Sequence, residues 1–463
     1  MENPRRILTP EEKESLQHLL ALREMPALDS AAQQYIAYVT QKSWDDEEVL
    51  AKIRKAVIAQ KDAYWKEGAA KNVVYKGAYS VFAYLAYQMP GYVHEICEVF
   101  ANLVSAGLIR KHIRVLDIGC GPGTAAVAVS RVLDAVPEMT AEITSVEPAE
   151  PFRDAFVKIV PALVSDRITA PRPLALDITK EIPDGEFDLI ILSNMLNELP
   201  LPQGGKEDLI MRLSERLVPD GNIILLEPAD LENATALRTI SRGVKRRGLT
   251  IYAPCNDIRG VPCPMQPCWS FAQGADIKPT KLMFALGGEE EKFRFVNTDI
   301  KYAYAILRKD GMRKCTYKIP PDAKRAWFSQ LKKHLGRRIH ITASVMSADI
   351  GDAKNYLFLV CDGTGKEPVY AALPAFHRTP EHEALLCASY GDVVAIDSVL
   401  VRWNEKQKAY NLLLGQESWC RLIVGKPTGK KCPDKAKALV KKYGTSKRHG
   451  VKYAGSKPKK NTN

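Results

Sequence analysis

The sequence predicts an α/β fold, in which a largely parallel sheet is preceded by a helical region and followed by a β-rich domain. From residue 113 onward, apolar strand-like segments alternate with segments of helical spacing, which is typical of a parallel sheet. A glycine-rich turn at 119–123 directly follows the first strand and opens a helix. Beyond residue 337 strands dominate. We expect a helical region, a sheet domain, a β-rich domain and a tail at 1–110, 111–320, 335–422 and 423–463, respectively.

Two patterns support the helical region. Thr9-Pro10-Glu11-Glu12 is a helix start, with a threonine cap and a proline at the first helical position. Between Tyr75 and Phe100, large apolar residues recur at roughly helical spacing. We therefore expect helices that precede and cap the sheet domain.

The elements of the sheet domain follow in order. The expected strands are 113–118, 142–146, 188–193 and 222–226, and the expected helices are 124–136, 151–160, 206–217 and 234–247. Two more strands, 249–253 and 293–307, are separated by about forty residues. The sheet domain therefore contains a cysteine-rich insertion at 253–290.

The C-terminal domain is expected to be an OB-like β-barrel. Strands are predicted at 338–347, 356–361, 369–373 and 393–402, with a second limb at 409–414. One helix, 381–389, falls between the third and fourth of these strands. This order matches the five-stranded OB-fold, which binds oligonucleotides in many proteins.

Composition and charge exclude a membrane protein and suggest a nucleic-acid partner. The 463 residues contain no apolar run long enough to span a bilayer, and the first residues do not resemble a signal peptide. We therefore expect a cytoplasmic protein. The segment from Arg421 to Asn463 contains 14 Lys and Arg residues and one acidic residue, which gives it a net charge of +13. The remaining residues of the chain therefore have a net charge of about −1. Such a tail is expected to be disordered and to bind nucleic acid, the alternative being a tail that only solubilises the protein.

The glycine-rich turn predicts a cofactor site. Gly119, Gly121 and Gly123 allow a tight turn and close approach of a ligand, and Asp117 ends the strand before them. Glu147 ends the next strand, where a carboxylate can accept the two hydroxyls of a ribose. The form D-x-G-x-G-x-G resembles the class I S-adenosylmethionine-dependent methyltransferases, which have a Rossmann-like sheet. That resemblance implies cofactor contacts from Asp177 and Asn194 as well. A nicotinamide-binding domain is the alternative.

No catalytic residue is predicted. The segment Ser193–Leu199, which follows the fourth strand, has no Pro-Pro pair to hold a base amine and no Pro-Cys nucleophile. Because methyl transfer can proceed through positioning alone, this pattern leaves activity open.

Three cysteines in the insertion predict a metal site. Cys255, Cys263 and Cys268 lie within fourteen residues of a proline-rich loop. Their spacing is longer than the short knuckles of common zinc sites and is compatible with a larger cubane cluster. Ordinary free thiols are the alternative. The candidates for a fourth ligand are Cys361 and Cys315, and we prefer Cys361 because it ends an apolar strand just before a turn.

Further motifs resemble a known family. They are the short segments Leu196-Asn197-Glu198-Leu199, Leu226-Glu227-Pro228, the basic helix expected at 234–247, Ala253-Pro254-Cys255 and Glu291-Lys292-Phe293. In these segments the chain resembles the methyltransferase-like assembly factors of the small ribosomal subunit. The resemblance covers about 75–310, and the first cysteine gap is longer here than in many members. It implies four cysteines that bind a [4Fe-4S] cluster, association with small-subunit ribosomal RNA and a role in its maturation. The family's fourth cysteine stands in a C-x-x-x-G turn, which matches Cys361 to Gly365.

We therefore expect an rRNA-binding assembly factor of the small ribosomal subunit with an iron–sulfur cluster. The alternatives are an active S-adenosylmethionine-dependent rRNA methyltransferase and a zinc-stabilised RNA-binding module without enzymatic activity. Besides the tail, the expected RNA contacts lie on the helix before the cysteine insertion: Arg238, Arg242, Lys245, Arg246 and Arg247.

Overall fold

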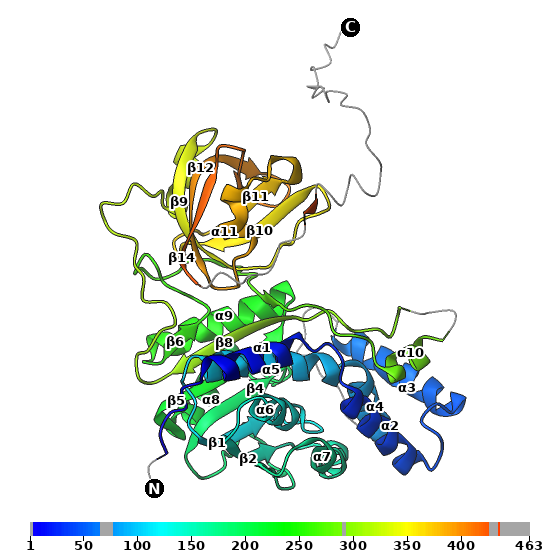
Figure 1. Cartoon of the computed structure of the whole chain (residues 1–463). Coiled ribbons are helices and arrows are strands. Elements are labelled where there is room, and N and C mark those ends of the chain that lie inside the picture. Colours follow the sequence, from blue (N-terminus) through cyan, green and yellow to red (C-terminus); the bar gives the residue numbers. More distant parts are fainter. Residues whose placement is uncertain (1–2, 65–76, 289–292, 426–433, 436–463) are drawn as a thin grey trace.

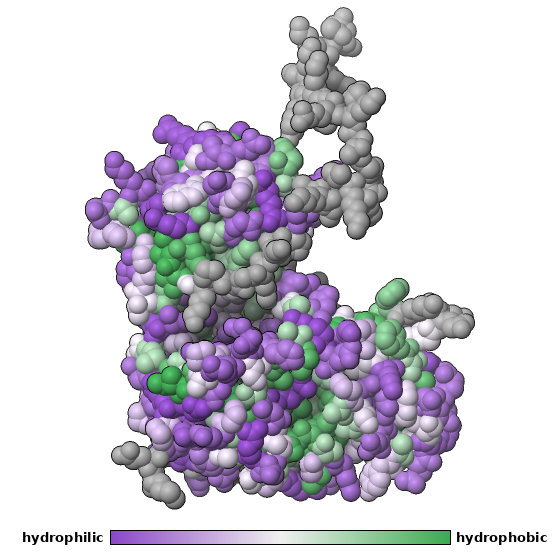
Figure 2. All heavy atoms as spheres, viewed as in Figure 1, coloured by the Kyte–Doolittle hydropathy of each residue, from purple (hydrophilic) through white to green (hydrophobic). Residues whose placement is uncertain are grey.

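A computed structural model describes residues 3–64, 77–288, 293–425 and 434–435. Most of the predicted basic tail lies outside the described residues. A helical layer and a large sheet form one body, and a separate barrel stands on it at the end that carries β6 and α9 (Figure 1). A deep notch separates the barrel from the helical part of the body (Figure 2). No helix in the described part of the chain is both long and apolar enough to cross a membrane.

The N-terminal region is helical, as predicted. Its helices are α1 (Pro10–Ala21), α2 (Pro26–Thr40), α3 (Glu47–Tyr64), α4 (Ala78–Tyr87) and α5 (Met89–Ser105). The α1 helix begins at a capping box, in which Thr9 and Glu12 satisfy each other's backbone N–H groups. The α5 helix is buried on almost all sides and packs on α6. The helices therefore share one apolar core with the sheet and do not form a separate cap.

The sheet has the order β3-β2-β1-β4-β5-β8-β6, with β7 paired to β8. The strands are β1 (His112–Ile118), β2 (Thr140–Val146), β3 (Ile168–Thr169), β4 (Phe187–Ser193), β5 (Leu217–Pro228), β6 (Thr250–Ala253), β7 (Ala272–Gln273) and β8 (Lys301–Arg308). The first five are parallel, and β8 runs antiparallel between β5 and β6. This order is that of the Rossmann-like methyltransferase sheet and confirms the predicted fold class. The chain order reverses between β1 and β4, and open α/β sheets bind ligands at such a point.

Helices cover both faces of the sheet. They are α6 (Thr124–Asp134), α7 (Glu150–Leu163), α8 (Gln203–Glu215) and α9 (Leu231–Arg246), whereas α10 (Lys281–Gly287) packs on α2, α3 and α4. The α6 and α7 helices pack on one face with the N-terminal helices, whereas α8 and α9 pack on the other. The predicted strand 293–307 was too long at its start, because Phe293 lies in an exposed turn and β8 begins only at Lys301.

The C-terminal region is a closed five-stranded barrel, as predicted, with its own apolar core. Its strands are β9 (Arg338–Val345), β10 (Asn355–Cys361), β11 (Val369–Pro374), β12 (Val393–Asn404) and β13 (Ala409–Leu413). Closure comes from the pairing of β13 with both β11 and β12. A sixth strand, which the sequence analysis missed, adds to β12: β14 (Trp419–Val424). Short helices precede the barrel and connect β11 to β12: η1 (Phe328–His334), η2 (Ala375–His377), η3 (Pro380–His382) and α11 (Glu383–Leu386).

The cysteine insertion joins the barrel to the body. The side-chain amide of Asn256 donates to Ser344 Oγ at 3.0 Å and to the carbonyl of Gly391 at 2.6 Å. The backbone N–H of Phe271 donates to the carbonyl of Met346. The barrel is therefore positioned by the same loop that carries the three cysteines.

Candidate functional sites

The glycine turn connects β1 to α6 as expected. Asp117 is buried near the end of β1, and all three glycines of the turn have positive φ. Gly123 has the strictest requirement: its φ is 100°, and a Cβ there would stand 2.1 Å from a methyl group of Val160. The backbone of the turn is therefore fixed by packing against α7.

Glu147, which follows β2, faces this turn. Its carboxylate accepts from the N–H of Gly121 at 3.0 Å and from the N–H of Ala149 at 2.9 Å. Asn194, just after β4, has a left-handed backbone with φ of 54°. Such strain in a residue other than glycine is common at functional sites.

Several buried polar atoms around the turn lack partners among the described residues. They include Asp117 Oδ2, Ser145 Oγ and Asn194 Oδ1. Buried polar atoms are normally hydrogen-bonded, so a group of orphaned atoms at the ligand end of a sheet fits a polar cofactor. Asp177 differs from them because it is exposed, accepts from Thr179 and pairs with Lys180 at 3.1 Å.

Two buried acids in this region have raised pKa values. Burial, with the negative charge of Glu147, raises the pKa of Asp117 to about 8. Burial also raises the pKa of Glu227, at the end of β5, to about 8. Glu227 accepts from the N–H of Leu196 at 2.9 Å and so shapes the loop after β4, while its Oε2 has no partner among the described residues. No role was predicted for Glu227 from the sequence. The feature that could have indicated one is an acidic residue at the end of an apolar, buried strand.

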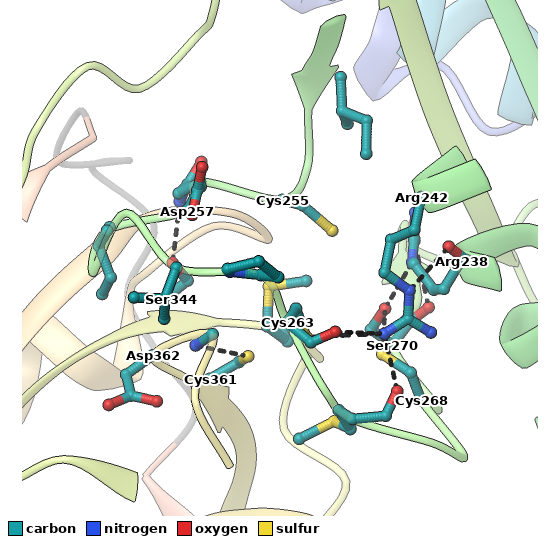
Figure 3. A pocket seen from close by; sticks show the side chains of 18 of the residues that line it. Arg238, Arg242, Cys255, Asp257, Cys263, Cys268, Ser270, Ser344, Cys361 and Asp362 are labelled. Carbon is teal, nitrogen blue, oxygen red and sulfur yellow. Dashed lines mark hydrogen bonds between the residues drawn. The ribbon is translucent and has the colours of Figure 1, made fainter. Parts of the chain in front are cut away.

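The four predicted cysteine ligands line one cavity of about 350 Å³ between the insertion and the barrel. Cys255, Cys263 and Cys268 come from the insertion, and Cys361 comes from the end of β10 (Figure 3). The fifth candidate, Cys315, does not line this cavity and is buried in a small apolar cluster with Ile258, Ile319 and Val393. Geometry therefore groups Cys361, and not Cys315, with the three cysteines of the insertion.

The thiols interact with one another and with α9. A hydrogen bond with Cys361 lowers the pKa of Cys263, and Arg242 acts in the same direction. Burial raises the pKa of Cys255 and of Cys268. Cys361 Sγ also accepts from the N–H of Gly363 at 3.3 Å.

Two of the predicted RNA-binding arginines point into this cavity region instead of into solvent (Figure 3). Arg238 is 2% exposed and donates to Ser270 Oγ, to the carbonyl of Tyr304 and to the hydroxyl of Tyr390. It is therefore not available to RNA in this structure. Arg242 donates to the carbonyl of Met265 at 2.8 Å and approaches Cys263 Sγ at 3.7 Å.

The remaining basic residues of this group lie nearer to solvent. Arg246 and Arg247 are exposed at the end of α9, and Arg247 pairs with Asp208 at 2.7 Å. Lys245 is half-buried and pairs with Asp257 at 3.2 Å.

The cysteine geometry does not form a compact single-ion site. Among the described residues, no group of three or more His, Cys, Asp or Glu side chains stands close enough to hold one metal ion. A zinc site would need sulfurs within about 2.3 Å of one point. The thiols are instead spread around a cavity, an arrangement that suits a group of several atoms.

The strand order, the glycine turn and the buried acids define a protein of the methyltransferase fold. The family model described as mitochondrial small ribosomal subunit Rsm22 matches residues 78–315, just over half of the chain, and the chain therefore belongs to the Rsm22 family. A second model, the C-terminal domain of the domain of unknown function DUF8157, matches residues 329–423, which contain the barrel.

Solved methyltransferases share low sequence identity with the chain. The magnesium protoporphyrin IX methyltransferase of Synechocystis PCC 6803, with bound S-adenosylmethionine, is 14% identical; the match covers 54% of this chain and 89% of that one, with a TM-score of 0.30. A putative RNA methyltransferase of Pyrococcus horikoshii is 12% identical, covering 48% and 87%, with a TM-score of 0.28. No curated protein sequence matches the chain.

The raised pKa of Asp117 predicts a pH-dependent stability. The unfolded chain releases this proton near its ordinary value of 3.8, whereas the folded protein keeps it to about pH 8. Between these values the folded state holds more protons, so the Asp117 contribution to the free energy of unfolding falls as pH rises. Relative to Asp117→Asn, the wild type should lose at least about 1.4 kcal/mol between pH 5 and pH 8.5, the equivalent of one pKa unit.

Urea unfolding of both proteins at the two pH values measures this difference. Asp184→Asn is the control, because Asp184 is exposed and pairs with Arg216 at the surface. If the difference in free energy of unfolding between the wild type and Asp117→Asn did not change with pH, the raised pKa of Asp117 would be contradicted.

Proposed function

We propose that this protein is an RNA-binding assembly factor of the small ribosomal subunit that carries a [4Fe-4S] cluster between its body and its barrel. The observation that carries the proposal is the cavity lined by four thiols from two parts of the chain. Membership in a small-ribosomal-subunit family supports the ribosomal association. That family is described as mitochondrial, so the cytoplasmic location expected from the sequence stays a prediction.

Cys255, Cys263, Cys268 and Cys361 would hold the cluster. When bound, the cluster would link the insertion to the barrel through thiolate bonds, and metal binding of this kind contributes to folding free energy. Arg238 and Arg242 line the same cavity, where their guanidinium groups would compensate the negative charge of four cluster-bound thiolates away from water. Arg242 also fixes the loop between Cys263 and Cys268 through its bond to Met265.

S-adenosylmethionine is the proposed ligand of the glycine turn. Asp117, Gly119, Gly121, Gly123, Glu147 and Asn194 surround the turn or face it, and the orphaned oxygens of Asp117 and Asn194 are available for hydrogen bonds to the cofactor. Asp177 stays a proposed contact. When bound, the cofactor supplies a methyl group, and an active rRNA methyltransferase is the second candidate function. In that case the residues of this chain orient the acceptor, since no base or nucleophile is assigned.

The first test of the proposal concerns the cluster. Anaerobically purified wild-type protein should be brown and hold about four iron atoms and about four acid-labile sulfides per chain. Cys263→Ser and Cys361→Ser should lose the cluster and some solubility, whereas Cys315→Ser should keep it, because Cys315 lies outside the cavity.

Colourless wild-type protein with a single zinc would overturn the cluster and favour the zinc-module alternative. Loss of the cluster in Cys315→Ser but not in Cys361→Ser would show that the ligand assignment is wrong.

The second test concerns RNA. Arg246→Gln together with Arg247→Gln should weaken binding to small-subunit rRNA and lower the salt dependence of the affinity by roughly one unit of slope per lost phosphate contact. A chain that ends at residue 425 should show a larger loss, because the basic tail is removed. Arg172→Gln, an exposed arginine on the loop after β3, is the control.

Filter binding at several salt concentrations measures both affinity and slope. Binding that does not depend on salt, or no binding to small-subunit rRNA, would defeat the assembly-factor proposal.

The third test concerns the cofactor. Calorimetry should detect S-adenosylmethionine binding to the wild type, and Gly121→Leu should abolish it, because Gly121 has φ of 54° and faces Tyr84 and Phe152. Gly204→Ala is the control, since a Cβ there meets open space. No binding to the intact wild type would exclude the methyltransferase candidate and leave the assembly factor in place.

A further inference from the structure

One outer surface of the barrel carries an exposed tryptophan among cationic side chains. We call it the outer barrel face and define it by Trp419 and Arg421 on β14, Arg338 and His340 on β9, and Arg402 on β12. All five residues are exposed. The residues that alternate with them along β9 and β14, Ile339, Ile341 and Cys420, are buried in the barrel core. The period-two alternation of β-strands therefore puts the aromatic and cationic groups outside.

Strand register groups four of these residues on one surface, and Arg402 lies further along β12, in register with Asn411 of β13. Trp419 pairs with Asp397 of β12, and Arg421 pairs with Ala395, two positions along the same face. His340 Nδ1 lies 2.9 Å from Asp397 Oδ1, so β9 contributes to the same surface. The face is therefore continuous across β14, β12 and β9.

Trp419 is 47% exposed, and the guanidinium of Arg421 lies 5.8 Å from the centre of its ring. A second exposed tryptophan, Trp327, borders the face beyond β9, because the N–H of the preceding Ala326 donates to the carbonyl of His340 at 2.8 Å. Phe328, next in the chain, is buried in the barrel core. Trp327 therefore lies beyond β9 at the border of the face, with the centre of its ring 4.5 Å from the guanidinium of Arg259.

The acids on this face are already paired. Asp397 contacts Arg325 and His340, and Glu417 contacts Arg338. Arg421 and Arg402 are exposed, and among the described residues neither has an acidic partner. The surface therefore keeps a positive charge next to its tryptophans.

We propose that the outer barrel face binds single-stranded RNA, with bases stacked on Trp419 and phosphates held by Arg421 and Arg402. Aromatic rings beside arginines in a positive surface are how sequence-tolerant single-strand binders hold their ligand, because every base has a π face and every nucleotide has a phosphate. In the sequence, β14 leads directly into a segment rich in Lys and Arg, which adds positive charge at this end of the chain. The proposal deepens the proposed RNA-binding function and rests on it.

The test uses the full chain and a twelve-nucleotide oligouridylate, at elevated salt, where electrostatic binding by other basic segments is weakened. Trp419→Ala should reduce affinity by about ten-fold, the order expected for one lost stacking contact, and Trp419→Phe should recover most of it. Arg421→Gln should lower the salt slope by about one. Phe376→Ala is the matched control, because Phe376 is 72% exposed on the same barrel but belongs to η2, outside this face.

Unchanged oligouridylate binding by Trp419→Ala would overturn the proposal, as would equal effects of the substitution on single-stranded and duplex RNA. The proposal would also be overturned if Trp419→Ala left RNA binding intact but abolished association with a protein. Thermal unfolding of each variant must match the wild type. If small-subunit rRNA still binds through Arg246, Arg247 and the tail while oligouridylate binding is insensitive to Trp419, this inference fails and the proposed function stands.

Discussion

The buried guanidinium of Arg238 is the interaction on which the arrangement of this molecule depends. It extends from α9 and is hydrogen-bonded at once to the insertion through Ser270, to β8 through the carbonyl of Tyr304, and to the barrel through Tyr390. A charged group without water is tolerated only when its donors are satisfied and its charge is offset. Three separate parts of the chain must therefore meet at this point for the charge to be buried.

The cysteine cavity follows from the same constraint. Once Arg238 and the neighbouring Asn256 hold the insertion against the barrel, Cys361 comes to the cavity that the insertion cysteines line. Arg242, one helical turn further along α9, then fixes the loop that bears Cys263. Helix α9, the insertion and the barrel thus form one structural unit, even though they come from different regions of the sequence.

The sequence predicted features that depend on neighbouring residues and missed those that depend on distant ones. The turn after Asp117 could be predicted because a strand, three closely spaced glycines and a helix follow one another directly in the sequence. Arg238, Arg242 and Lys245 share one helical face by spacing, but only the insertion and the barrel determine that this face is covered. Strand β14 was not predicted, because Arg421 was counted with the basic tail, although Trp419 and Arg421 alternate with buried Cys420 as in a strand. The choice of Cys361 over Cys315 came from a turn motif and a family resemblance, since nothing local relates residue 361 to residue 263.

The position of the insertion in the sheet keeps the cysteine cavity apart from the glycine turn. It leaves β6, the last strand in the order, and returns to β8, whereas the glycine turn lies at the centre, where β1 meets β4. A loop at the border of a sheet can lengthen, acquire ligands or change partners with little effect on the packing around a central turn. A change in the length or the ligands of the insertion would therefore alter how the barrel is attached and leave the backbone of the central glycine turn as it is.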